Sequence, residues 1–473
     1  MVSCKYRRAH EHSTKDRLSW DSNALRNNFV VALSDMYQEE VPLYSTLVDI
    51  VRQVDQAKIG SGQLPRRHEL ERHGAIRLGT GREMNCIRRL FAVLGMHPVG
   101  YYDLSVMGLP LHATAFRPID ESCLESNPFR VFATLLRVDE LPFEIRDLVE
   151  TVLYQRDIFP PRLLQTLTRL EAGERLLDQD AIDLIADALE VFRWHSRSPT
   201  SLVQYKSMHS AHPIIADIVC FPSAHINHLT PRTLDIDMVQ AEMIKHGLPA
   251  KARIEGPPRR NCPILLRQTS FQALQEDVEF RGPDGAFIPY THTARFGEIE
   301  QRGAALTRKG RRLYDDLLAL ARQRIGDAPE GSPESETAFA EAFAGFPDTW
   351  SELRAQDLVY FKYTLVPGSE AVMAGRKAMS MADLVSQGVL SYEPITYEDF
   401  LPFSAVGIFM SNVKTESNGS STRTHETGPG AKSSLEEVLG CRILDEFDLY
   451  RSMQRRSIDD CRRVLGLEQI VKS

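Results

Sequence analysis

Residues 291–303 carry two acids and two arginines in a short segment with the alternation of a β-strand. At a period of two residues, one face of such a strand presents Phe296, Glu298, Glu300 and Arg302. A helical pattern follows at 306–320, so we expect the strand to pack under a helix rather than lie free in water. Two acids on one buried face repel each other unless a cation or a proton lies between them. The carboxylates therefore need a partner, and a metal ion is one candidate.

The rest of the chain predicts an α+β fold with a mixed β-sheet core. Helices are expected at 21–40, 44–54, 83–94, 237–246 and 434–465, and strands at 73–80, 99–104, 252–254, 264–269 and 358–365. Residues 128–195 keep a leucine-rich helical period between acidic and basic faces, which predicts a helical insertion. No strand is followed by G-x-G-x-x-G and no P-loop is present, which disfavours a nucleotide-binding fold.

The chain is long enough for a large core, and we expect one catalytic unit over residues 21–470. A disordered stretch is expected before it, at 1–20. Two further segments are expected to be flexible loops. These are 326–336, which is acidic and rich in proline and serine, and 415–434, which is rich in serine, threonine and glycine.

Charge and cysteine usage restrict the class of partner. The net charge of −8 gives no general attraction to nucleic acid or to an anionic membrane, so an anionic ligand needs a local positive site. The basic first residues lack an apolar core of a signal peptide, and no run approaches the ~18 apolar residues that span a bilayer. The seven cysteines form no Cys-x-x-Cys pair, which favours reduced thiols and a cytoplasmic protein. Nothing in the sequence indicates an oligomeric state.

Histidines close to other polar residues are the candidate ligands. His73 and Arg77 are four residues apart on a predicted strand, which places them on one face with Cα atoms roughly 13 Å apart. This spacing suits a metal ligand at one end of an extended diacid and an anion clamp at the other. The alternative is that Arg77 pairs with a nearby acid. His225 and His228 are three apart, so on one strand at most one of them joins a given site.

Alternation alone does not choose between Glu298 and Glu300, and His292 on the same face is a competing ligand. Two histidines and one carboxylate form the facial triad of non-haem Fe(II) oxygenases, which leaves positions for substrate and O2. A structural zinc site is disfavoured because thiolate pairs are missing, and a serine hydrolase because no G-x-S-x-G occurs. A glycosidase pair is disfavoured because adjacent acids on one face cannot flank a bond from two sides.

Four motifs make the sequence similar to a known family. They are H-G-A-I-R-L-G-T from His73, H-I-N-H-L-T-P-R-T-L-D-I-D from His225, R-F-G-E-I-E-Q-R-G from Arg295 and Y-E-D-F-L-P from Tyr397. They resemble the 2-oxoadipate dioxygenase/decarboxylase family, and the resemblance covers about residues 23–454. That family is similar to the vicinal-oxygen-chelate superfamily, which includes 4-hydroxyphenylpyruvate dioxygenase and hydroxymandelate synthase. The resemblance implies a sheet core of that kind with a helical insertion and helical termini.

The resemblance also implies an Fe(II) ion held by His73, His228 and Glu298. Glu298 is preferred because Glu-Ile-x-Gln-Arg resembles the metal-binding strand of 4-hydroxyphenylpyruvate dioxygenase. Arg77 is expected to clamp the distal carboxylate of the substrate, and Ser404 is a second candidate for that pocket. The implied reaction converts 2-oxoadipate and O2 into 2-hydroxyglutarate, expected as the D form, and CO2, in lysine catabolism.

One departure from the family pattern concerns the substrate pocket. Phe403 stands where valine usually follows Leu-Pro, and its larger ring can narrow the substrate pocket. This departure leaves two alternatives open. The protein can be a dioxygenase for a different 2-oxo acid, or a non-catalytic homologue that binds a metal or a small molecule.

Overall fold

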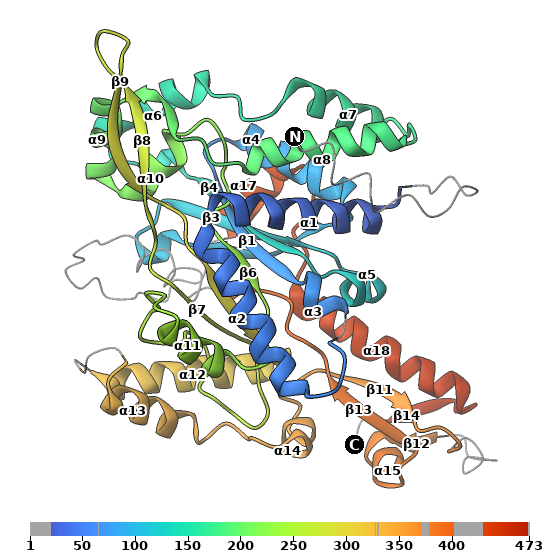
Figure 1. Cartoon of the computed structure of the whole chain (residues 1–473). Helices are drawn as coiled ribbons and strands as arrows, with labels where there is room; N and C mark the ends of the chain where they lie inside the picture. The colour runs from blue at the N-terminus through green and yellow to red at the C-terminus, as the bar shows by residue number, and fades with distance from the viewer. Residues whose placement is uncertain are drawn as a thin grey trace.

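The computed structural model describes residues 20–64, 66–326, 328, 331–369, 378–401 and 429–471. At its centre lies a five-stranded mixed sheet with the order β2-β3-β4-β1-β6 (Figure 1). Its strands are β1 (Arg72–Leu78), β2 (His97–Asp103), β3 (Leu111–Arg117), β4 (Arg130–Leu136) and β6 (Leu229–Pro231). β1 runs parallel to β4 and antiparallel to β6, and His73 lies opposite Thr230 of β6. The predicted α+β class with a mixed sheet is confirmed.

The central sheet separates two hydrophobic cores, because successive residues of a strand point to opposite faces. In β1, Ala75 belongs to one core, while Ile76 and Leu78 belong to the other. His73 and Arg77 therefore share the face of Ala75, as the alternation predicted, and both are buried. A buried polar or charged side chain needs a partner, so this face of β1 must carry polar groups within its core.

Helices from both ends of the chain cover the face of Ile76. Asp21 caps the first of them by accepting a hydrogen bond of 2.7 Å from the backbone nitrogen of Ala24. Figure 1 shows α1 and α2 crossing in front of the sheet. The helices with buried residues in this core are α1 (Ser22–Glu40), α2 (Pro42–Ile59), α4 (Gly81–Val93), α7 (Pro161–Glu171), α8 (Asp178–Phe192), α11 (Ile236–Lys245) and α17 (Pro429–Leu439).

The other core, on the face of Ala75, is enclosed by helices and by smaller sheets. The helices are α6 (Phe143–Gln155), α9 (Leu202–Ala211), α10 (Pro213–Val219), α12 (Arg308–Ile325), α13 (Pro333–Phe343), α14 (Trp350–Ala355), α15 (Met381–Ser386) and α18 (Glu446–Val464). The smaller sheets are β5 (Arg197–Ser201), β8 (Gln275–Arg281) and β9 (Phe287–Thr293); β7 (Leu266–Ser270) and β10 (Glu298–Arg302); β11 (Phe361–Leu365) and β13 (Leu390–Pro394); and β12 (Ala378–Ser380) and β14 (Gln469–Val471). Two short helices, α3 (Arg66–Leu70) and α5 (Glu121–Ser126), complete the set. In the described part of the chain, no helix combines the length and the apolar character needed to cross a membrane.

The segment 291–303 is two strands rather than the single strand predicted. β9 pairs with β8, whereas β10 pairs antiparallel with β7. Residues 294–297 between them form no strand, and the carbonyl of Phe296 accepts a hydrogen bond of 2.7 Å from the hydroxyl of Tyr37 in α1. Gly297 allows this passage, since a Cβ there would lie 2.2 Å from the Phe271 ring. His292 therefore belongs to a different sheet from Glu298, and α11 is the helix that packs against β10.

Three other expectations about secondary structure need correction in part or in full. The helical insertion contains α6, α7 and α8, but the interval from 128 begins with β4, whose apolar run is that of a strand buried on both faces. Residues 252–254 form no strand, and only isolated bridges at Ala250 and Glu255 flank them. Helices occupy the ends of both expected loops, because α13 begins at Pro333 after the N-cap Ser332, and α17 begins at Pro429. Residues 1–19 and 415–428 lie outside the described residues.

Candidate metal centre and substrate site

Three side chains from separate segments meet beside the central sheet. His73 lies on β1, His228 directly precedes β6, and Glu298 is the first residue of β10. One ligand atom of each lies within 4.8 Å of the others, and all three residues are buried. The pairing of β1 with β6 brings the two histidines together. The backbone nitrogen of Phe296, which donates to the carbonyl of Asn227 over 3.1 Å, brings the start of β10 to the same place.

The polar atoms of this cluster are only partly satisfied. Oε2 of Glu298 lies 2.8 Å from Nε2 of His73 and accepts a hydrogen bond of 2.9 Å from the hydroxyl of Thr230. The same hydroxyl lies 2.9 Å from Nδ1 of His228. Oε1 of Glu298 is buried and has no hydrogen-bond partner among the described residues. Leaving such an oxygen unbonded costs about 1–3 kcal/mol, so a bound cation would remove a penalty that the protein carries without it.

Glu300 approaches His73 from the side opposite Glu298. Its Oε2 lies 2.8 Å from Nδ1 of His73, an ion-pair contact rather than a well-aligned hydrogen bond. Its Oε1 accepts a hydrogen bond of 2.9 Å from Nε of Arg302. A carboxylate behind the second nitrogen of an imidazole is the usual support for a metal-binding histidine. This geometry favours Glu298 as the ligand and Glu300 as the residue that orients His73.

Burial and charge set the protonation of the cluster. Burial lowers the pKa of His228 to about 3. Burial also lowers the pKa of His73, but the carboxylates of Glu300 and Glu298 outweigh it and raise that pKa above its ordinary value. Burial raises the pKa of Glu298, but His228 and His73 outweigh it and leave that pKa below its ordinary value. His228 is therefore neutral and Glu298 charged, as metal ligands must be, and a cation has to compete with the proton of His73.

A buried group of arginines and acids surrounds Glu300. Glu71 accepts hydrogen bonds from Arg67 at 3.0 Å, Arg130 at 2.9 Å and Arg232 at 3.1 Å. Arg67 and Arg130 also bond to Glu398, the former over 2.7 Å. Nη1 of Arg130 lies 3.7 Å from Glu300, which links the group to the residue behind His73. Charges held this firmly in a protein interior fix the position of Glu300.

Arg77 forms an ion pair with Asp217 of α10, which is the alternative that the sequence left open. Asp217 also accepts from Nε2 of His225 at 3.1 Å and from Nε2 of His292 at 2.9 Å. His292 is thus outside the candidate metal cluster. His225 is a hydrogen-bonding residue, as expected for the histidine that does not join the site with His228, although 224–228 is not a strand. Ser404 and Phe403 lie outside the described residues.

Sequence reasoning missed Thr230, Asp217 and the arginines around Glu71. A signal existed for the first two. Thr230 is two residues after His228 in the same motif, and Asp217 is the single acid in the apolar run 214–220. A charged residue inside an apolar helix period requires a buried partner, and that requirement predicts a network without naming its members.

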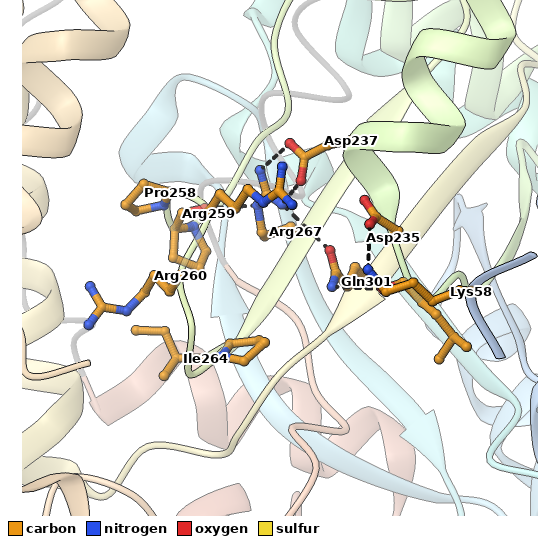
Figure 2. Close-up of a pocket in the computed structure, with 12 residues that line it drawn as sticks. Lys58, Asp235, Asp237, Pro258, Arg259, Arg260, Ile264, Arg267 and Gln301 are labelled. Carbon is orange, nitrogen blue, oxygen red and sulfur yellow. Dashed lines mark hydrogen bonds and ion pairs between the residues drawn. The ribbon is translucent and has the colours of Figure 1, made fainter. Parts of the chain in front are cut away.

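A separate cavity of about 250 Å³ lies on the opposite side of β10, where Gln301 projects (Figure 2). Its acids already have cationic partners. Asp235 accepts from Lys58 over 2.8 Å, and Asp237 accepts from Arg267 over 2.7 and 3.0 Å. None of the three clustered residues lines this cavity, so it is distinct from the candidate metal centre.

Comparison with known proteins identifies the family. The family model for 2-oxoadipate dioxygenase/decarboxylase matches residues 29–412, which is most of the chain. The chain belongs to the 2-oxoadipate dioxygenase/decarboxylase family. A member of this name from Escherichia coli is 46% identical over 457 residues, which cover 93% of this chain and 98% of that protein. A Mycobacterium tuberculosis member is 37% identical over 450 residues, which cover 91% of this chain and 96% of that protein.

A crystal structure of a Pseudomonas putida hydroxyglutarate synthase in complex with 2-oxoadipate has the same fold as this member of the 2-oxoadipate dioxygenase/decarboxylase family. The TM-score is 0.85 at 42% identity, and the match covers 96% of this chain and 100% of the other. The family resemblance stated from the motifs is therefore confirmed.

Proposed function

We propose that this protein is an Fe(II)-dependent dioxygenase and decarboxylase that converts 2-oxoadipate and O2 into 2-hydroxyglutarate and CO2. The main support is the buried cluster of His73, His228 and Glu298 in a chain of this family. The reaction balances without another reductant. One carbon of 2-oxoadipate leaves as CO2, the remaining five form 2-hydroxyglutarate, and both atoms of O2 enter the organic product.

His73, His228 and Glu298 would hold the ferrous ion, because they combine two imidazoles with one carboxylate and leave coordination positions for substrate and O2. A ferrous ion supplies the redox chemistry with O2 that no side chain provides. Glu300 keeps His73 oriented with Nε2 toward the cluster. Thr230 bridges His228 and Glu298, which holds the imidazole and the carboxylate in a fixed relation.

Arg77 would bind the distal carboxylate of 2-oxoadipate. It shares a face of β1 with His73 but lies four residues further along the strand. An extended diacid can therefore reach the metal ligands with one end and Arg77 with the other. The planar guanidinium fork matches a carboxylate, and its charge supplies the local positive site that a protein of net charge −8 requires. Ser404 remains a second candidate for this pocket, and Phe403 a residue that narrows it.

The proposal extends to product and compartment. We expect the D form of 2-hydroxyglutarate and a place in lysine breakdown. The cysteines of the described residues are all free, which is consistent with reduced thiols in the cytoplasm.

The test is O2 consumption by metal-free protein reloaded anaerobically with Fe(II). 2-Oxoadipate is compared with 2-oxoglutarate and with 2-oxohexanoate, the monocarboxylate of the same length. The proposal expects the highest kcat/KM with 2-oxoadipate, with CO2 and 2-hydroxyglutarate formed and D configuration on chiral chromatography. A preference for another 2-oxo acid supports the first alternative named above. Absence of O2 consumption with every acid supports the non-catalytic homologue.

A further inference from the structure

Asp217 is a buried acid outside the candidate metal centre, and it contacts side chains from three other segments of the chain. It lies on α10 and is 4% exposed. Its Oδ2 pairs with Nη1 of Arg77 on β1. Its Oδ1 accepts from His225, in the segment before β6, and from His292 on β9. Nδ1 of His292 lies 3.0 Å from the hydroxyl of Tyr205 on α9.

The two imidazoles that donate to Asp217 are themselves fixed by aromatic packing. The ring of Trp194 stacks on His292 with an interplanar angle of 6° and meets His225 edge-on at 4.9 Å. Phe221 packs against both, with centroid distances of 4.7 Å to His292 and 5.6 Å to His225. The carboxylate plane of Asp217 is therefore held by two rings that have little freedom to turn.

This arrangement constrains Arg77. A guanidinium presents five N–H donors in a rigid fork, so fixing one terminal nitrogen fixes the direction of the whole plane. Because both donors from the histidines are taken by Oδ1, Oδ2 is left to face Arg77. Burial raises the pKa of Asp217, but Arg77, His225 and His292 outweigh it and hold that pKa well below its ordinary value. Arg77 and His73 share one face of β1, so the guanidinium lies on the same side of the central sheet as the candidate metal centre.

We propose that Asp217, held by His225 and His292, is a positioning residue that aims Arg77 at the distal carboxylate of the substrate and so sets the preference for 2-oxo diacids over 2-oxo monoacids. This inference rests on the proposed function of Arg77. Two effects of removing the carboxylate oppose each other. Loss of its negative charge leaves Arg77 more attractive to an anion. An amide in its place, however, has an NH2 group that faces either Arg77 or the two histidine donors. In both cases a donor meets a donor, which disturbs the direction of the Arg77 guanidinium.

The loss of aim outweighs the gain in charge, because a bidentate carboxylate contact depends on the direction of the fork and not only on its distance. For metal ligands, loss of the group that orients the ligand costs about 10- to 100-fold in affinity, and we take the lower end of that range for Arg77. Asp217→Asn should therefore weaken the binding of 2-oxoadipate by at least about tenfold and leave 2-oxohexanoate, which has no distal carboxylate, within about twofold.

The experiment measures anaerobic binding of both acids to the Fe(II)-loaded protein by calorimetry. It compares the wild type, Asp217→Asn and a milder variant, His292→Gln, which replaces one of the two imidazole donors by an amide that lacks the ring packed against Trp194 and Phe221. The expected loss of diacid preference is about threefold in His292→Gln. The matched control is Asp187→Asn. Asp187 on α8 is 9% exposed and accepts two hydrogen bonds of 2.7 Å from Arg162 on α7, so the variant breaks a largely buried arginine–aspartate pair outside the group around Asp217 and should leave the preference unchanged.

A lower preference for the diacid in Asp217→Asn and His292→Gln, with the control unchanged, supports the inference. Two results overturn it: an unchanged preference in Asp217→Asn, which includes an equal loss for both acids, or a wild type that binds both acids equally. If Asp217→Asn does not fold, His292→Gln alone decides. Turnover of 2-oxoadipate by the wild type is measured in parallel. Turnover with an unchanged preference in the variants overturns the inference alone, whereas absence of turnover overturns the proposed function.

Discussion

Replacing Glu298 and Glu300 one at a time by glutamine separates a metal ligand from the residue that orients another ligand. Glutamine keeps the size of the side chain and removes its charge. The two acids lie two residues apart on one face of β10 and both contact His73. Their remaining partners differ, because Glu300 pairs with Arg302 and Glu298 bonds to Thr230. We therefore expect one variant to lose more stability and the other to lose more of its affinity for the metal.

In the metal-free protein, Glu300→Gln should be the more destabilising change. It leaves the guanidinium of Arg302 buried without its carboxylate, and breaking one partner of a buried ion pair costs about 3–5 kcal/mol. Glu298 has no arginine partner in the described part of the chain, and glutamine can keep one of its acceptor contacts. Its replacement should cost about 1–3 kcal/mol.

For iron binding the order should reverse. Glu298→Gln removes one of three ligands together with the only charge among them, so stoichiometric Fe(II) should no longer be retained. Glu300→Gln keeps all three ligands and loses only the group behind His73, which should weaken Fe(II) binding by about 10- to 100-fold.

The assay has two parts. Urea denaturation of chelator-treated protein, followed by circular dichroism, gives the free energy of unfolding. Anaerobic titration with Fe(II) followed by metal analysis gives the affinity and the stoichiometry. Equal loss of iron in both variants would refute the assignment of Glu298, and so would a Glu298→Gln protein that is less stable than Glu300→Gln in the absence of metal.

Three further changes have defined outcomes. Arg77→Lys should raise KM for 2-oxoadipate at least about tenfold, because an ammonium cannot form a bidentate contact, and steady-state kinetics with unchanged KM would exclude the clamp. Gly74→Ala should lower stability by about 1–3 kcal/mol, because its Cβ would lie 2.5 Å from Cδ1 of Ile226 and 2.9 Å from the carbonyl of His228; an unchanged denaturation midpoint would contradict this packing. Burial lowers the pKa of His112 to about 4, so below about pH 6.5 the unfolded chain binds a proton that the folded protein does not. Stability should fall by about 1 kcal/mol from this residue between pH 7.5 and 5.5, and an equal slope in His112→Asn would show that His112 is not the cause.

The sequence pattern was sufficient to predict which side chains of the site share a face when they lie within one strand. Period-two alternation placed His73 with Arg77 and Glu298 with Glu300, and the structure keeps both pairs on shared faces. The alternation was extended wrongly through residues 294–297. At this interruption the carbonyl of Phe296 bonds to the hydroxyl of Tyr37, which is distant in sequence. A strand pattern contains no information about such a partner.

Long-range ion pairs were the other missing part. The pattern of 214–220 contains a buried acid, but it does not say that Arg77, His225 and His292 will surround it. The sequence pattern could not choose between Glu298 and Glu300 for the same reason. It depends on Arg302 and Arg130, which reach Glu300 and not Glu298, and this difference appears only when the strands are assembled.

The most direct test of the proposed reaction is turnover of 2-oxoadipate under ¹⁸O2 by protein loaded with Fe(II). If the cluster of His73, His228 and Glu298 supports a decarboxylating dioxygenase, each O2 consumed should yield one CO2 and one 2-hydroxyglutarate that carries both labelled oxygen atoms. Mass spectrometry of the product and the yield of CO2 measure this. CO2 release without O2 consumption, or 2-hydroxyglutarate without label, would contradict the proposed reaction.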